Sequence, residues 1–211
     1  MSLLDLLDTI DTALGPKGSD GRRRAVEDLI KAEEQRRILK VGDQAPLFSL
    51  PHADKGLVSS AELLRQGPLV IGFYRGLWCP YCQRDLIGLE IAMPEIKAAR
   101  ASAVAISHQI LSGDSRLFHD GQKFSFPILD DATGYVAEQF GIRWNMADLS
   151  LIQEELGMNL LGFRGTDPWM RPMQARYVVG RDGIIVFAEV AYNYDQRSEP
   201  VAVLSTLTRL A

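Results

Sequence analysis

Two cysteines separated by two residues are the part of this sequence best suited to chemistry. Cys79 and Cys82 stand in the segment Trp78-Cys79-Pro80-Tyr81-Cys82 and are the only cysteines among the 211 residues. A thiolate is a nucleophile that can be oxidised and reduced reversibly. Positions i and i+3 of a helix lie about 5–6 Å apart, so the two thiols can close a disulfide after modest adjustment. The pair therefore indicates thiol redox chemistry.

The elements around the pair predict different roles for the two thiols. The apolar run over residues 69–74 is typical of a buried strand, and Cys79 stands where the next helix begins. Unpaired backbone N–H groups and the positive end of the helix dipole favour an anion there, which predicts a lowered pKa for the Cys79 thiol. Pro80 suits the first helical position, where its missing N–H is no loss. Cys82, one turn inside the helix, is the predicted resolving thiol.

Two other uses of the cysteines compete with redox chemistry. A zinc site needs about four ligands, and the sequence has neither a second Cys-x-x-C pair nor paired histidines to complete one. Free cysteines are also common in apolar cores, so an inert buried pair stays open. Neither a metal nor another cofactor is expected.

The patterns along the chain predict an α/β fold with a mixed sheet. Apolar residues recur at helical spacing before residue 41, which predicts an N-terminal helical extension over 1–40, followed by one domain over 41–211. The extension is expected to pack on the same core or on another subunit. The segments expected to be extended are 48–50, 57–58, 69–74, 101–107, 126–129, 176–179 and 184–187. The expected helices are 3–14, 22–40, 80–99 with a bend at Pro94, 111–120, 133–140, 146–157 and 199–211, and 158–173 is expected to be an irregular loop. Strands that alternate with helices and then end in a hairpin and a helix indicate mixed strand directions.

Composition excludes several classes of function. The hydrophobic fraction of 46% and charged fraction of 24% are those of an ordinary globular protein. The net charge of -4, with both signs interspersed, gives no reason to expect nucleic-acid binding. The first ten residues lack the basic start of a secretory signal, and no apolar run is long enough for a membrane span. A cytoplasmic location is therefore expected, in which both thiols are kept reduced at rest.

The segment 73–82 resembles the active-site segment of the peroxiredoxin-like branch of the alkyl hydroperoxide reductase/thiol-specific antioxidant (AhpC/TSA) superfamily. The resemblance extends over residues 41 to about 208. It includes a lead-in segment at 41–51, a middle segment at 126–131 and a late hairpin at 177–183. Three matching segments in the right order are specific for the superfamily.

This resemblance implies a thioredoxin-like fold and a thiol-dependent peroxidase. Cys79 would attack the O–O bond of hydrogen peroxide or a small organic hydroperoxide, and Cys82 would condense with the resulting sulfenic acid. A thiol reductant such as thioredoxin, glutaredoxin or a low-molecular-weight thiol would then reduce the disulfide, and a homodimer is one possible assembly. The alternative is a thiol–disulfide oxidoreductase that uses the Cys79/Cys82 couple, because Cys-Pro-Tyr-Cys is also the glutaredoxin sequence. A redox sensor is a third alternative.

Two positions depart from the family pattern. The family has a threonine three residues before the reactive cysteine, where this chain has Gly76. The family also has an arginine three residues before the aromatic residue of the late strand. If that aromatic is Tyr177, the corresponding residue is Gln174, and the neighbouring Arg176 is expected on the other face of the strand. Arg75 is the candidate to replace the missing charge.

The remaining site candidates are side chains close to the cysteines in sequence. Trp78, Gly76, Tyr74 and Pro80 are the expected lining of a substrate pocket. His108 follows the predicted strand 101–107 and is a candidate proton donor to the leaving oxygen, with simple packing as its alternative role.

Overall fold

The computed structural model describes residues 38–52, 56–76, 79–108, 124–145, 170–191 and 200–210. These residues form a seven-stranded sheet in the order β2-β1-β5-β4-β3-β8-β9 and a separate two-stranded sheet of β6 and β7. The strands are β1 (Ser49–His52), β2 (Gly56–Ser59), β3 (Leu69–Phe73), β4 (Ser102–Ser107), β5 (Ile128–Asp130), β6 (Arg143–Asn145), β7 (Met170–Pro172), β8 (Gln174–Val179) and β9 (Ile185–Ala191). The helices are α2 (Ser60–Gln66), α3 (Pro80–Ile91), α4 (Met93–Ala98), α5 (Tyr135–Gln139) and α7 (Pro200–Leu210).

Strand β3 is an interior strand of the large sheet. It pairs in parallel with β4 and antiparallel with β8, so that Gly72 lies opposite Ala105 on one side and Arg176 on the other. All five residues of β3 are buried. A strand covered on both faces has no exposed side on which polar residues are useful, which explains the continuous apolar run in the sequence.

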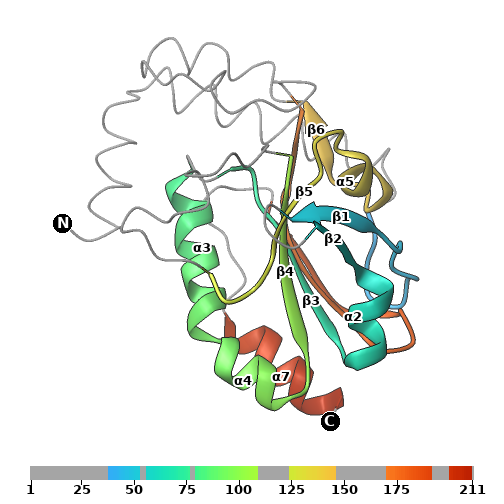
Figure 1. Cartoon of the computed structure of the whole chain (residues 1–211), viewed down its shortest axis with the longest axis vertical. Helices are drawn as coiled ribbons and strands as arrows, with labels where there is room; N and C mark the ends of the chain where they lie inside the picture. The colour runs from blue at the N-terminus through green and yellow to red at the C-terminus, as the bar shows by residue number, and fades with distance from the viewer. Residues whose placement is uncertain are drawn as a thin grey trace, which may run out of the picture.

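Helices cover both faces of the sheet (Figure 1). Helices α3, α4 and α7 pack on one face, where apolar side chains such as Val70, Leu86, Ile96 and Leu207 form one core cluster. Helices α2 and α5 pack on the other face, over a second cluster. Alternate residues of β3 and β8 contribute to the two clusters, as the two-residue period of a strand requires.

An ion pair ties helix α3 to strand β8 inside the first of these layers. Arg176 donates from Nη2 to Oδ2 of Asp85 at 2.6 Å, and the two side chains are only 4% and 9% exposed. The guanidinium lies over Gly72, which has no side chain to displace it. The expectation that Arg176 faces away from Gln174 is wrong. Residues two apart in a strand share a face, and both side chains reach helix α3.

Most predicted elements within the described residues are confirmed. The predicted strands lie within a residue or two of β1 to β5 and β8, and β9 begins one residue after its predicted start but continues four residues past its predicted end. The late hairpin turns at Gly183, where φ is +81°. The predicted bend at Pro94 is a break between α3 and α4, because proline cannot continue the hydrogen-bond ladder of a helix. The predicted helices at 133–140 and 199–211 correspond to α5 and α7.

Four parts of the chain differ from the prediction. Residues 38–40 are not helical, and the N–H of Leu39 donates instead to the carbonyl of Phe140. Strand β7 lies in the segment expected as an irregular loop, and it pairs with β6 across a long stretch of sequence. Strand β6 and helix α2 were not predicted. Segments of three to seven residues give too little periodicity to be recognised, so long-range pairing and packing decide them.

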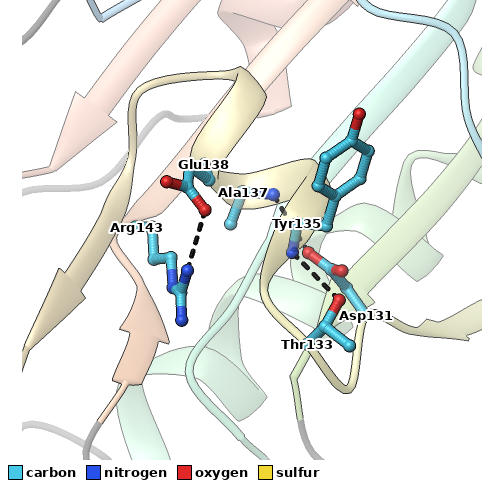
Figure 2. Close-up of polar contacts among 6 residues, drawn as sticks. All are labelled: Asp131, Thr133, Tyr135, Ala137, Glu138 and Arg143. Carbon is cyan, nitrogen blue, oxygen red and sulfur yellow. Dashed lines mark hydrogen bonds and ion pairs between the residues drawn. The ribbon is translucent and has the colours of Figure 1, made fainter.

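Helix α5 is held by contacts at both of its ends (Figure 2). The carboxylate of Asp131 accepts a hydrogen bond from the N–H of Ala137 at 3.0 Å, and the hydroxyl of Thr133 accepts one from the N–H of Tyr135. Arg143, in β6, pairs with Glu138 at 2.7 Å. Asp131 therefore serves the fold by satisfying backbone donors at the start of α5.

The helices predicted at 3–14, 111–120 and 146–157 lie outside the described residues. Helix 22–40 also lies there except for its last three residues. The boundary between an extension over 1–40 and a domain over 41–211 stays a prediction.

We predict that the Arg176–Asp85 pair acts as a unit in stability. Arg176→Met leaves the Asp85 carboxylate buried without its partner, and Asp85→Leu does the same to the guanidinium. Each change should cost about 3–5 kcal/mol in the free energy of unfolding. The double variant removes both charges and should recover most of that loss, as measured by urea denaturation.

The exposed pair of Arg65 and Glu62 is the control. Its side chains are 75% and 65% exposed, so Glu62→Gln should change the free energy of unfolding by about 1 kcal/mol or less. Additive losses in the Arg176/Asp85 double variant would contradict the prediction.

Candidate active site

The two cysteines lie at the junction between strand β3 and helix α3. The chain leaves β3 at Phe73, and Cys79 is the residue that caps the start of α3, with extended backbone angles of φ -89° and ψ 113°. Its carbonyl accepts the hydrogen bond from the N–H of Gln83, which closes the first helical turn. Pro80 is the first helical residue, as predicted. The predicted position of Cys79 at the helix start is thus confirmed.

Both thiols are reduced and buried. Cys79 is 2% exposed and Cys82 is fully buried in the cluster beneath α3. Cys79 stands at the N-terminal end of the helix, where the helix dipole stabilises negative charge, whereas Cys82 lies inside the first turn. Burial disfavours the thiolate form of both cysteines. The helix end stabilises a thiolate only at Cys79, so Cys79 is the cysteine that ionises more readily.

Cys82 has a specific polar partner on strand β8. Its thiol donates to Oε1 of Gln174, with 3.7 Å between sulfur and oxygen. Gln174 is itself 4% exposed and precedes the ion-paired Arg176 by two residues on the same strand face. Gln174, the residue predicted to occupy the position of the family's arginine, therefore contacts the second cysteine through its amide.

Polar side chains collect where β3, β4 and β5 end. Tyr74 follows β3, and burial raises the pKa of its hydroxyl far above the ordinary value. The nearby Cys82 raises this pKa further, and the Ser107 hydroxyl acts in the opposite direction. Ser107, the last residue of β4, lies opposite Asp130 in β5. Tyr74 thus lies between Cys82 and the side chains at the ends of β4 and β5.

The carboxyl group of Asp130 has a raised pKa. Partial burial raises its pKa from 3.8 to about 6, and the adjacent charge of Asp131 contributes to the rise. One of its carboxylate oxygens, Oδ1, is buried and accepts no hydrogen bond from the described residues. Burial also raises the pKa of Asp131, although backbone N–H groups of α5 act in the opposite direction.

The structure describes only some of the predicted site residues. Arg75 and Gly76 are both buried between β3 and Cys79. Gly76 has a φ of +156°, which residues with a Cβ seldom adopt, so the family's threonine would be strained there. Trp78 lies outside the described residues, and so does the side chain of Pro80. The predicted substrate pocket stays a prediction.

His108 lies directly after β4 and is buried at the same end of the sheet. Its predicted role as a proton donor stays a prediction. Among the residues described, no group of three or more His, Cys, Asp and Glu side chains is arranged to hold a metal ion. None of the helices described is long and apolar enough to cross a membrane. The expected cytoplasmic location stays a prediction.

Sequence reasoning missed Asp130 and the contact partners of α3. Gln174 was recognised as a departure from the family pattern, but its contact with Cys82 joins residues 92 positions apart. The two-residue period of a strand would have placed Gln174 and Arg176 on one face. Nothing near Asp130 in the sequence marks its partial burial.

Known proteins match this chain over the residues that form the sheet and the thiol site. The AhpC/TSA family profile matches residues 41–188. Peroxiredoxin Bcp of Escherichia coli K12 is 36% identical over 104 residues, which is 49% of this chain and 65% of Bcp.

Solved structures share the fold. Peroxidoxin BcpB from Mycobacterium tuberculosis has a TM-score of 0.64 at 23% identity, over 82% of this chain and 99% of that one. The reduced 2-Cys peroxiredoxin of Plasmodium vivax has a TM-score of 0.60 at 14% identity, over 81% of each chain. The expected thioredoxin-like fold is confirmed.

We predict that Asp130 makes stability depend on pH. Its pKa is raised in the folded protein, so between about pH 4 and 6 the folded chain keeps a proton that the unfolded chain has lost. This contribution is fully present below pH 4 and is lost as the pH rises through 6. Asp130→Asn keeps the neutral form, and above pH 6 it should be more stable than the wild type by about 1 kcal/mol, allowing for partial exposure.

Urea denaturation at several pH values between about 4.5 and 8 measures this difference. The exposed Glu62→Gln is the control and should show no such trend. A difference between Asp130→Asn and the wild type that stays constant over this range would contradict the assignment.

Proposed function

The chain belongs to the AhpC/TSA family and is an oxidoreductase of the peroxiredoxin type; we propose that Cys79 is its peroxidatic thiol and Cys82 its resolving thiol. The substrate is hydrogen peroxide or a small organic hydroperoxide. The observation that carries the assignment is the placement of two reduced thiols one turn apart, with Cys79 at the start of α3.

The proposed reaction has two steps on the protein. The Cys79 thiolate attacks one peroxide oxygen, a sulfur–oxygen bond forms, and the O–O bond breaks. The departing oxygen takes up a proton and leaves as water or an alcohol, while Cys79 becomes a sulfenic acid. The Cys82 sulfur then attacks Cys79, the hydroxyl group of the sulfenic acid leaves as water, and a disulfide remains. An external thiol reduces this disulfide and restores both thiols.

Charge on the departing oxygen needs stabilisation during the first step. We assign this role to Arg75, which is 3% exposed and lies between β3 and Cys79. The positive end of the α3 dipole is a second source of stabilisation for this charge. Trp78, Gly76, Tyr74 and Pro80 are the proposed lining of the substrate pocket, on the strength of their positions beside the thiols in the sequence.

The reductant is a thiol, and thioredoxin, glutaredoxin and low-molecular-weight thiols are the proposed candidates. Assembly as a homodimer is part of the same proposal, as is a cytoplasmic location. Sedimentation of the purified chain and fractionation of cells that express it test these two points.

We predict that peroxide converts the wild type to an intramolecular Cys79–Cys82 disulfide. Intact mass under non-reducing conditions should show a loss of two hydrogen atoms, because the chain offers no other internal thiol. Cys82→Ser should stop at a sulfenic acid or an intermolecular bridge, and Cys79→Ser should stop consuming peroxide.

Stopped-flow tryptophan fluorescence provides the discriminating measurement. Rapid stoichiometric reaction with peroxide supports the peroxidase. If the protein does not react with peroxide but reacts rapidly with disulfides, the peroxidase assignment is wrong and the chain is a thiol–disulfide oxidoreductase. An intersubunit disulfide in the wild type would remove Cys82 from the resolving role.

We further predict that Arg75→Met slows the reaction of Cys79 with peroxide by about 10²-fold, the usual effect of losing one donor to a developing oxyanion. Reaction with a neutral alkylating agent reports thiolate availability alone and should slow much less. Arg84→Met, which removes an exposed charge from α3, is the matched control. Equal slowing of both reactions by Arg75→Met would mean that Arg75 only tunes the thiol pKa.

A further inference from the structure

The hydrogen bond between Cys82 and Gln174 has a direction that matters for the chemistry. The thiol is the donor and the amide oxygen Oε1 is the acceptor, 3.7 Å apart, with both groups buried. An amide oxygen accepts a hydrogen bond from a neutral thiol but repels a thiolate. The contact therefore favours the protonated form of Cys82.

Arg176 and Tyr74, which lie near this contact, do not oppose this preference. The cation on the same face of β8, Arg176, is bound to Asp85 at 2.6 Å, so its charge is already matched. Tyr74, which interacts electrostatically with Cys82, is itself strongly held in its neutral form by burial. The other ionisable groups at this end of the sheet are Arg75, His108 and Asp130, which follow or end the neighbouring strands.

Cys79 is in a different position. It caps the start of α3, where backbone N–H groups favour an anion, while Cys82 is fully buried one turn further along. The two thiols are close in sequence but have opposite electrostatic partners: a helix end for one and an amide oxygen for the other.

We propose that Gln174 is a positioning residue that keeps Cys82 as a neutral thiol in the reduced enzyme and thereby reserves the reaction with peroxide for Cys79. The proposal rests on the proposed peroxidase function and names the residue that separates the roles of the two thiols.

The retained proton has a use in the resolving step. When the Cys82 sulfur attacks the sulfenic acid of Cys79, the sulfur–sulfur bond forms and the sulfur–oxygen bond breaks. The departing hydroxide needs one proton to become water, and the Cys82 thiol brings it. Cys79 sulfenic acid and Cys82 thiol thus give disulfide and water without another acid. The hydrogen bond to Gln174 must break in this step, since the sulfur turns towards Cys79.

Substitution of Gln174 tests the proposal by titration of each thiol alone. Cys82 is followed in a Cys79→Ser background through the ultraviolet absorbance of its thiolate, with a variant lacking both cysteines as the blank. Gln174→Arg replaces the acceptor with a cation and should lower the titration midpoint of Cys82 by about 1–3 pH units. Gln174→Glu places a negative charge there and should raise the midpoint by a similar amount.

Two controls separate this role from a general effect. Gln139→Arg adds the same charge at an exposed position on α5, on the other side of the sheet, and should leave the Cys82 midpoint unchanged. In a Cys82→Ser background, Gln174→Arg should move the Cys79 midpoint far less than it moves that of Cys82. Equal shifts of the two thiols, or no shift of Cys82 in either Gln174 variant, would overturn the proposal.

Reaction with peroxide supplies the functional test. Cys79→Ser alone should leave Cys82 unreactive, and the addition of Gln174→Arg should speed its oxidation at least about tenfold, because the thiolate fraction grows. If Gln174→Arg lowers the titration midpoint of Cys82 but leaves its rate of oxidation by peroxide unchanged, then the protonation of Cys82 is not what restricts the peroxide reaction to Cys79, and that part of the proposal is overturned. If the wild type itself did not consume peroxide, the peroxidase assignment would fail, while the titrations would still decide whether Gln174 holds the Cys82 proton.

Discussion

Helix α3 is held to strand β8 by two polar contacts inside an otherwise apolar layer, and the geometry of the thiol pair depends on them. The ion pair of Asp85 with Arg176 lies one turn along the helix from the contact of Cys82 with Gln174. A buried ion pair gains little over apolar packing, but its geometry tolerates little displacement because an unmatched buried charge is costly. It therefore fixes the rotation of α3 about its axis more strictly than the surrounding leucine and isoleucine contacts, which are non-directional.

The junction between β3 and α3 combines rigidity with reactivity. Strand β3 is buried on both faces and paired on both edges, so the point at which the chain leaves the sheet is well defined. The helix that follows begins at Pro80, and its N-cap residue is Cys79, which places the thiol at the positive end of the helix dipole. An arrangement of this kind needs neither metal nor cofactor to favour a thiolate at one position. At Cys82, one turn away, burial favours the neutral thiol.

The ends of the parallel strands add a second set of ionisable groups beside the thiols. Tyr74 links Cys82 to Ser107 and Asp130, and burial keeps the tyrosine neutral while it raises the pKa of the aspartate to about 6. Asp131, the next residue, faces the start of α5 and satisfies its backbone donors. The two adjacent carboxyl groups thus differ in their surroundings: Asp130 ends β5, whereas Asp131 follows the strand and contacts the start of α5.

The sequence alone determined the chemistry, the class of fold and the separate positions of the two thiols. A Cys-x-x-C pair between an apolar run and a helix start is a local pattern, and local patterns follow from strand and helix periods. The tertiary structure decided what each thiol faces. Gln174 and Arg176 reach Cys82 and Asp85 from 92 and 91 residues away, and the partners in β6 and β7, such as Arg143 and Pro172, are 25 to 29 residues apart. Such contacts depend on which faces of the sheet and helix meet, and on how deeply each group is buried. Periodicity fixes the face of each element, but the pairing of faces and the loss of water from each side chain arise only when the whole chain packs.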